Sequence, residues 1–110
     1  MLLRQIKFFV SIVDENSFTQ AAEKNFVSQS AVSQAINSLE SELGVKLIER
    51  KNRSFKVTTA GEYFYRKCKA ILSDLENIKK ETIRLGSDEE TTLHVGYINL
   101  YATTLSMSSA

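Results

Sequence analysis

The fold is decided by residues 28–44, which read SQSAVSQAINSLESELG. One side of this stretch carries apolar residues at the spacing of a helix face, namely Val32, Ile36, Leu39 and Leu43. The other side carries short, uncharged hydrogen-bonding residues, namely Ser30, Ser33, Gln34, Asn37 and Ser41. A helix face that meets only water usually carries Lys and Glu, which hydrate well and favour helices more than Ser or Asn. The uncharged face therefore indicates either a specific partner or a polar surface that happens to lack charge.

The residues before this stretch predict two more helices. Apolar residues recur at positions 2, 6, 9 and 13, which predicts a first helix over 2–13. Ser17 is a good N-cap for a short helix over 18–24, and Ser28 is a good N-cap for the third helix. Gly44 is suited to end that third helix. A short helix, a tight turn and a helix with a polar outer face are the arrangement of a helix-turn-helix.

After Gly44 the pattern changes from helical to β-like. Residues 47–50 and 55–58 favour strands around a polar turn at 51–54, which predicts a two-stranded hairpin. Five basic residues and the single acid Glu49 lie here, a net charge of +4 in a chain whose total is +1. The basic residues are Lys46, Arg50, Lys51, Arg53 and Lys56. A basic run can be a solvated loop, but its place directly after a helix-turn-helix favours a wing.

Residues 59–62, TAGE, have the spacing of a capping box and predict a fourth helix over 60–85. Its seam repeats every 4 and 3 residues, is apolar except at Thr82, and consists of Phe64, Cys68, Ile71, Leu75, Ile78, Thr82 and Leu85. This spacing is typical of a coiled coil. At ~1.5 Å per residue the helix is longer than a unit of under 60 residues is wide. We therefore expect a second copy of the chain to cover the seam; the alternative is a core helix that folds back on its own domain.

The sequence predicts three segments: a winged helix-turn-helix over 1–58, a linker and dimerisation helix over 59–86, and a further segment over 87–110. Residues 86–92, GSDEETT, are typical of a polar hinge, and residues 92–98, TLHVGYI, alternate as a strand does. One strand cannot bury its own faces. We therefore expect residues 87–110 to be a hinge and the truncated start of a second domain.

The composition narrows the classes of function. With 43% hydrophobic and 25% charged residues, the chain is typical of a globular domain, and it has no apolar run long enough for a membrane span. Its single cysteine, Cys68, fits a reducing cytoplasm. Its single histidine, His94, and the lack of a Gly-rich phosphate loop predict no metal site, no cofactor and no enzymatic activity.

The uncharged helix face, the basic hairpin and the seam together predict a dimeric DNA-binding protein. Gln, Asn and Ser read base edges in the major groove, and Lys and Arg bind phosphates. The predicted base contacts are Gln29, Ser30, Ser33, Gln34 and Asn37. The predicted backbone and wing contacts are Ser28, Arg50, Lys51, Arg53 and Lys56. The predicted dimer contacts are Phe64, Cys68, Ile71, Leu75, Ile78 and Leu85. The main alternative is a protein–protein interaction module that acts through the fourth helix.

Four motifs carry a resemblance to a known family: SFTQAA at 17–22, SQSAVSQAI at 28–36, LESELGVKLIER at 39–50 and VTTAG at 57–61. In this order and at this spacing, residues 1–85 resemble the N-terminal winged helix-turn-helix and linker helix of the LysR-type transcriptional regulators. The resemblance implies a bacterial, cytoplasmic homodimer that binds a pseudo-palindromic operator in double-stranded DNA, with Arg53 entering the minor groove. It also implies that a small-molecule inducer would bind only to a C-terminal domain. Residues 93–97, LHVGY, resemble the beginning of that domain.

Some positions depart from the pattern of that family. Asn25 stands where an apolar residue is usual, and we expect the neighbouring Phe26 to take over its packing. Gln34 stands where Arg is common, which favours adenine at the contacted base. Glu40 and Arg50 flank the junction between the third helix and the hairpin, and we expect them to form an ion pair.

Overall fold

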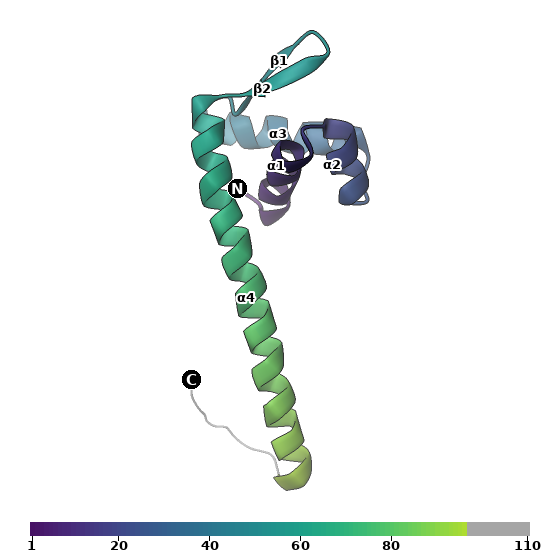
Figure 1. Cartoon of the computed structure of the whole chain (residues 1–110), viewed down its shortest axis with the longest axis vertical. Coiled ribbons are helices and arrows are strands. Elements are labelled where there is room, and N and C mark those ends of the chain that lie inside the picture. Colours follow the sequence, from purple (N-terminus) through teal and green to yellow (C-terminus); the bar gives the residue numbers. More distant parts are fainter. Residues whose placement is uncertain (97–110) are drawn as a thin grey trace. The chain divides into compact units, whose positions relative to one another are not determined.

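The computed structural model describes residues 1–96, and for 88–96 it describes the backbone alone. Six elements follow one another (Figure 1): α1 (Leu3–Glu15), α2 (Phe18–Lys24), α3 (Gln29–Leu43), β1 (Ile48–Lys51), β2 (Ser54–Val57) and α4 (Thr59–Gly96). This confirms the predicted fold class, a mainly α winged helix-turn-helix followed by a long helix. The chain divides into two compact units, of which the first covers Met1–Ser73 and the second begins at Asp74. Helix α4 therefore contributes to both units.

The two helices of the helix-turn-helix begin and end where their local sequence predicts. The Ser17 hydroxyl accepts a hydrogen bond from the N–H of Gln20 at 3.0 Å, and the Ser28 hydroxyl accepts one from the N–H of Ala31 at 3.1 Å. Each serine thus satisfies a backbone donor that the first helical turn leaves unpaired. Gly44 ends α3 in the left-handed region, at a φ of 75°.

The core lies where α1, α2, α3 and the start of β1 meet. Its fully buried large side chains are Phe9, Ile12, Val32, Ile36, Leu39 and Leu47. The predicted apolar faces are confirmed in the middle of each helix but are too long at two ends. Leu2 precedes α1 and is exposed, and Leu43 lies in the last turn of α3 with 38% of its surface exposed. Both residues lie at helix ends, beyond the region where the three helices cross.

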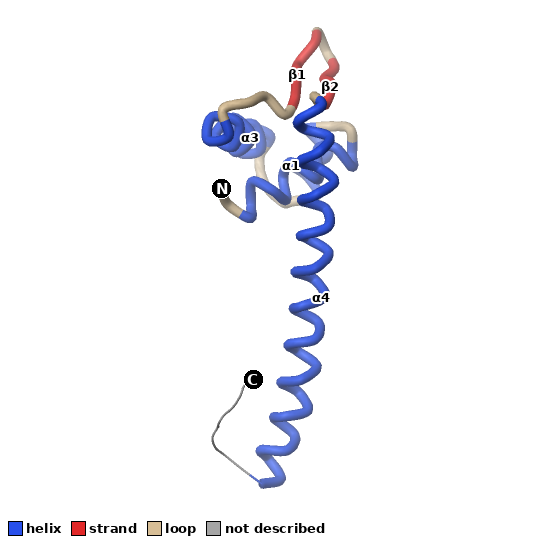
Figure 2. Tube along the Cα trace, turned by 90° about the vertical axis from the view of Figure 1, so that its left-hand side faces the viewer, coloured by secondary structure: helices blue, strands red, loops and turns tan. Residues whose placement is uncertain are grey.

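The wing is a short antiparallel hairpin (Figure 2) in which Ile48 pairs with Val57 and Lys51 pairs with Ser54. Its turn therefore consists of two residues rather than the predicted four. The first of them, Asn52, has a φ of 51°. Asn tolerates this left-handed conformation better than most residues, because its short polar side chain can hydrogen-bond locally.

The start of α4 is tied to the segment that follows α3. The Thr58 hydroxyl accepts a hydrogen bond from the N–H of Gly61 at 2.9 Å and donates one to the carbonyl oxygen of Lys46 at 2.7 Å. The N–H of Thr58 also donates to the carbonyl oxygen of Leu47 at 3.0 Å. The N-cap is thus Thr58 rather than the predicted Thr59, and α4 begins at Thr59 instead of at position 60.

The first turn of α4 lies directly against backbone at Gly61. A Cβ atom at this position would stand 2.2 Å from the carbonyl oxygen of Leu47 and 2.8 Å from the Cγ1 atom of Val57. No real Cβ contact with backbone is that short, so glycine is what allows the helix to approach the wing and the core at this point.

The next turns of α4 pack against α1. Cys68 is only 2% exposed and lies in a small apolar cluster with Ile6 and Val10. The ring of Phe64 lies 5.6 Å from the ring of Phe9. The sequence assigned Phe64 and Cys68 to a dimer seam, whereas the structure buries Cys68 within its own chain and packs the half-buried Phe64 against the core. A periodic seam on one helix does not reveal which surface covers it. Burial also raises the pKa of the Cys68 thiol.

A polar cluster closes the same contact between α1 and α4. The carboxylate of Asp14 accepts hydrogen bonds from the Tyr65 hydroxyl and from the Lys69 ammonium, the latter at 2.8 Å. Burial by itself raises the pKa of Asp14, but these two hydrogen bonds and the charge of Lys69 lower it below its usual value. The interaction therefore stabilises the fold above the pH at which an ordinary Asp titrates, and it is lost as the pH falls through the lowered pKa.

The structure differs from the prediction over residues 86–96, where α4 continues instead of giving way to a hinge and a strand. Gly86 sits inside the helix with open space around the position of a Cβ atom. Glu89 and Glu90, which follow it, are good helix formers, so a glycine and local polarity did not suffice to end the helix. Positions 97 and 98 of the predicted strand lie outside the described residues.

Within residues 1–96, no helix has the length and apolarity of a membrane span.

We predict that Gly61→Ala lowers the free energy of unfolding of the first unit by ~1–3 kcal/mol, because the added methyl group forces the Leu47 backbone to move. Thermal or urea unfolding followed by circular dichroism measures this change. Gly86→Ala is the matched control, because its methyl group meets no atom within 4 Å and alanine favours a helix. Equal stability of Gly61→Ala and the wild type would show that the close approach is not a constraint.

Candidate nucleic-acid interface

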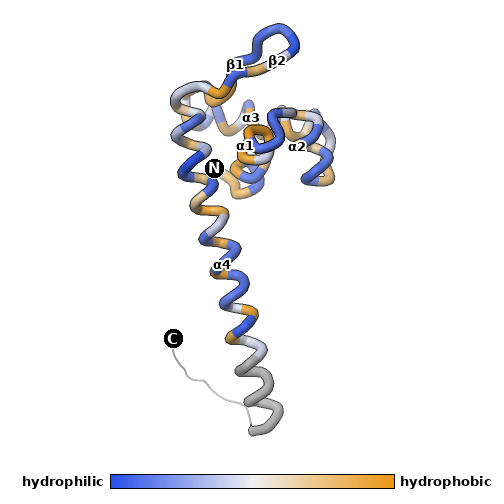
Figure 3. The backbone as a smooth tube through the Cα atoms, viewed as in Figure 1, coloured by the Kyte–Doolittle hydropathy of each residue, from blue (hydrophilic) through white to orange (hydrophobic). Residues whose placement is uncertain are grey.

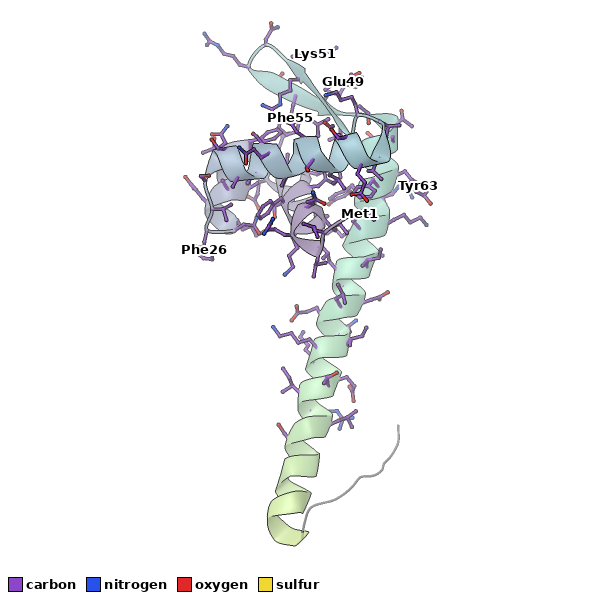
Figure 4. The ribbon with its side chains drawn as sticks, turned by 180° about the vertical axis from the view of Figure 1, so that it is seen from behind. Met1, Phe26, Glu49, Lys51, Phe55 and Tyr63 are labelled. Carbon is purple, nitrogen blue, oxygen red and sulfur yellow. The ribbon has the colours of Figure 1, made fainter. Side chains whose placement is uncertain are left out.

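Helix α3 presents the uncharged face that the sequence predicts. The side chains of Gln29, Ser30, Gln34 and Asn37 are exposed, and Ser33 is half-buried. Figure 4 shows α3 along its length with the wing next to it, so one side of the molecule offers both elements. This side combines donors and acceptors of short reach on α3 with the cations of the hairpin.

A cleft separates the start of α3 from the wing. It is lined by the first turn of α2, by Gln29 at the start of α3, and by Arg50 and Arg53 of the hairpin. Across it the Thr19 hydroxyl donates a hydrogen bond to the side-chain oxygen of Gln29 at 3.2 Å. The role of Thr19 depends on a contact between two helices and therefore has no local signature in the sequence.

The wing holds three of the predicted backbone-binding cations at its surface. Lys51 lies at the end of β1, Arg53 in the turn and Lys56 on β2, and all three are exposed. Among residues 1–87, whose side chains the structure describes, none of these three cations forms an ion pair with an acidic residue. Their charge is therefore available to an external anion. The predicted contact Ser28 remains bound to the N–H of Ala31 through its hydroxyl.

Arg50 lies in a different environment from the other wing cations. Its guanidinium carbon is 4.1 Å from the ring centre of Phe18, and its Nη2 atom is 3.4 Å from the hydroxyl oxygen of Ser33. The expected ion pair between Arg50 and Glu40 is absent among the described residues. That expectation was wrong because sequence proximity to a junction does not show which groups the backbone brings together.

Glu40 instead holds the backbone that leads into the wing. It is only 7% exposed, and its Oε2 atom accepts hydrogen bonds from the N–H groups of Leu47 and Ile48 at 2.7 and 3.0 Å. Its other oxygen lies 3.6 Å from the ammonium nitrogen of Lys46. A buried carboxylate needs such partners, and two backbone donors together with one cation provide them.

The turn between α2 and α3 shows that the expected packing role of Phe26 was wrong. Phe26 is 94% exposed and has a φ of 59°, so it does not take over an apolar packing position. Figure 4 shows its side chain at this turn, pointing away from the helices. Asn25 makes the tertiary contact instead, since its amide donates to the Ser11 hydroxyl at 3.0 Å and to the carbonyl oxygen of Ala21 at 2.8 Å.

The remaining seam residues of α4 are exposed in the single chain. Ile71 belongs to the first unit, and Leu75, Ile78 and Leu85 belong to the second. Figure 3 shows such hydrophobic positions recurring among hydrophilic ones along α4. Ile83 is also exposed, although it lies outside the predicted seam. Near it, the guanidinium of Arg84 lowers the pKa of Glu81 through a hydrogen bond and its charge.

A profile described as "Bacterial regulatory helix-turn-helix protein, lysR family" matches residues 3–62. The chain belongs to the LysR family. Among the curated relatives of this LysR-family chain is the HTH-type transcriptional regulator BenM of Acinetobacter baylyi. It is 39% identical over 98 residues, which cover 89% of this chain and 32% of BenM. The chain thus spans about a third of the length of these curated relatives.

Solved structures of DNA-binding domains also match this chain. The crystal structure of the BenM DNA-binding domain with catB site 1 DNA has a TM-score of 0.76 and 40% identity, over 79% of this chain and 97% of that one. The complex of the CbnR DNA-binding domain with DNA has a TM-score of 0.69 and 31% identity, over 79% and 99% of the two chains. The LysR-family chain therefore matches two DNA-binding domains over nearly their whole length.

We predict that Glu40→Ala lowers the free energy of unfolding of this LysR-family chain by at least ~2 kcal/mol. Each buried N–H left without a partner costs ~1–3 kcal/mol, and the substitution leaves two. Urea unfolding measures the loss. The control is Glu42→Ala on the same helix, which breaks only an exposed pair with the amino terminus and is expected to cost less than about 1 kcal/mol. An equal loss in the two variants would contradict the role given to Glu40.

Proposed function

We propose that this LysR-family chain is the DNA-binding part of a sequence-specific, dimeric transcriptional regulator. One observation carries the proposal: the uncharged polar face of α3 lies next to a wing whose exposed cations form no ion pair within the described residues. Phosphates supply the anions that such a wing needs, and base edges supply the donors and acceptors that such a helix face needs. The DNA complexes of two structural neighbours support the same conclusion.

In this proposal α3 lies in the major groove of double-stranded DNA, and the wing follows the backbone. The proposed base contacts are Gln29, Ser30, Ser33, Gln34 and Asn37. The proposed backbone contacts are Ser28, Lys51, Arg53 and Lys56, with Arg53 at the turn positioned to enter a narrow minor groove. Gln34 can form two hydrogen bonds with adenine, which favours that base in each half-site.

We also propose that the chain forms a homodimer through α4. Ile71, Leu75, Ile78 and Leu85 are the exposed members of the predicted seam, and covering them removes apolar surface from water. Two equivalent DNA-binding units favour a pseudo-palindromic operator. The alternative of a protein–protein interaction module loses its support, because the relatives are named as transcriptional regulators.

The proposal includes a cytoplasmic location, where a bacterial operator lies, and no enzymatic activity. Among the described residues, no group of three or more His, Cys, Asp or Glu side chains is arranged to hold a metal ion. A small-molecule inducer would bind in a C-terminal domain outside the winged helix-turn-helix. Residues 87–110 would then lead into that domain.

We predict that Arg53→Ala weakens DNA binding and reduces the slope of log affinity against log salt concentration by about one unit, because one phosphate contact is lost. Gel-shift titrations at several salt concentrations measure both quantities. Lys80→Ala is the control, since it removes an exposed cation of α4 away from the seam repeat. An unchanged affinity and slope for Arg53→Ala would contradict the assignment of the wing.

We predict that Leu75→Glu converts the dimer to a monomer, because a carboxylate in an apolar seam has to be desolvated without a partner. Sedimentation velocity measures the oligomeric state. Ser73→Glu adds the same charge on α4 outside the seam repeat and is expected to leave the dimer intact. If Leu75→Glu remains dimeric, the interface lies elsewhere.

A further inference from the structure

Among the four cations of the hairpin itself, Arg50, Lys51, Arg53 and Lys56, only Arg50 has a charged group that contacts another described side chain. Its guanidinium stacks on Phe18 of α2, and the ring of Phe18 meets the ring of Phe55 edge-on, with 5.3 Å between the ring centres. Phe55 is also the residue that pairs with Arg50 across the hairpin. The ring of Phe18 thus holds the Arg50 guanidinium, and the ring of Phe55 supports Phe18. In this position the guanidinium reaches Ser33 of α3.

We propose that Arg50 is a positioning residue that turns the hydroxyl of Ser33 into a hydrogen-bond donor toward a purine N7 atom. The inference rests on the proposed function, since it concerns how α3 reads a base. It assigns Arg50 a role in specificity, in place of the phosphate contact that the sequence analysis predicted for it.

The chemistry of the two groups dictates the direction of the hydrogen bond between them. A guanidinium has donors and no acceptor, so the Ser33 oxygen accepts from Arg50. The hydroxyl has only one hydrogen of its own, and this hydrogen cannot point toward the cation. Among the residues whose side chains the structure describes, 1–87, the Ser33 hydroxyl donates to no protein acceptor, since its one hydrogen bond is the one from Arg50. The hydrogen is therefore available to a ligand, and the nearby positive charge makes it a stronger donor.

The position of Ser33 favours N7 among the acceptors of a base pair. Guanine and adenine both present N7 in the major groove, on the side of the groove near the backbone of their own strand. Ser33 lies on the side of α3 that faces the wing, where Arg50 reaches it, and the wing is the proposed backbone-binding element. A donor in this place selects a purine over a pyrimidine without distinguishing adenine from guanine.

The test begins with the full chain and a random pool of double-stranded DNA, from which the preferred operator is selected. Gel-shift titrations then compare operators that differ at single base pairs, using the wild type, Ser33→Ala, Arg50→Met and the double variant. We expect Ser33→Ala to reduce the ratio of affinities for purine and pyrimidine at one base pair by about three- to tenfold. We expect Arg50→Met to reduce this ratio at the same base pair, and the double variant to reduce it no more than either single variant.

Two further measurements separate this role from a merely structural one. Replacing the purine at that base pair by its 7-deaza analogue removes the N7 acceptor. This replacement should lower the DNA affinity of the wild type by the same factor and leave the DNA affinity of Ser33→Ala unchanged. The salt slope of Arg50→Met should equal that of the wild type, whereas Lys51→Met, a variant of an exposed neighbour, should lower it by about one unit. Circular dichroism identifies folded variants, and Arg50→Lys, which keeps the charge without the planar group, should show the same loss of preference.

Three results would overturn the inference. They are a lower salt slope with unchanged base preference in Arg50→Met, full affinity of the wild type for the 7-deaza operator, and losses in Ser33→Ala and Arg50→Met at different base pairs. A failure of the proposed function looks different, because the wild type would then select no sequence from the random pool.

Discussion

The arrangement of this LysR-family domain depends on the hydrogen bonds that the buried carboxylate of Glu40 accepts from the backbone. Helix α3 has to end and the chain has to turn into a strand within a few residues, which leaves backbone N–H groups without helical partners. One buried oxygen of Glu40 takes the N–H groups of both Leu47 and Ile48. The helix that carries the uncharged face thereby fixes the first residues of the wing, so that the spacing between the two proposed DNA-contacting elements is set inside the protein.

The other groups of the same short segment hold the start of α4. The carbonyl oxygen of Leu47 accepts from the N–H of Thr58, the carbonyl oxygen of Lys46 accepts from the Thr58 hydroxyl, and the missing side chain of Gly61 allows α4 to approach. Residues 46–48 therefore connect three elements through backbone groups. Three of these four hydrogen bonds have a side-chain partner, Glu40 or Thr58, and together they keep α3, the wing and the first turn of α4 in register.

Much of the first unit could be predicted from local sequence, because local chemistry determines it. Ser17, Ser28 and Gly44 set the limits of α2 and α3 through hydrogen bonds and backbone conformations that span only a few residues. Several wrong or missing predictions concern contacts between distant segments, whereas the predicted hinge and strand over 86–96 failed locally, where α4 continues. Glu40 bonds to backbone, which has no sequence signature, and the exposure of Phe26 follows from a left-handed turn that Asn25 ties to α1. The site residues of α3 stay predictions, since hydrogen bonding to DNA leaves no trace in the free protein.

The seam of α4 shows why periodicity alone could not assign partners. Its repeat of 4 and 3 residues runs unbroken from Phe64 to Leu85. The first two members, Phe64 and Cys68, pack on α1, while the members from Ile71 onward are exposed in the single chain. One pattern therefore serves an intrachain contact first and an unpaired surface afterwards. A second copy that covers Ile71 would begin within one helical turn of Cys68, so the proposed dimer contact would start next to the core of the DNA-binding unit. The proposed dimer would then constrain each α3 through α1 and the first turns of α4.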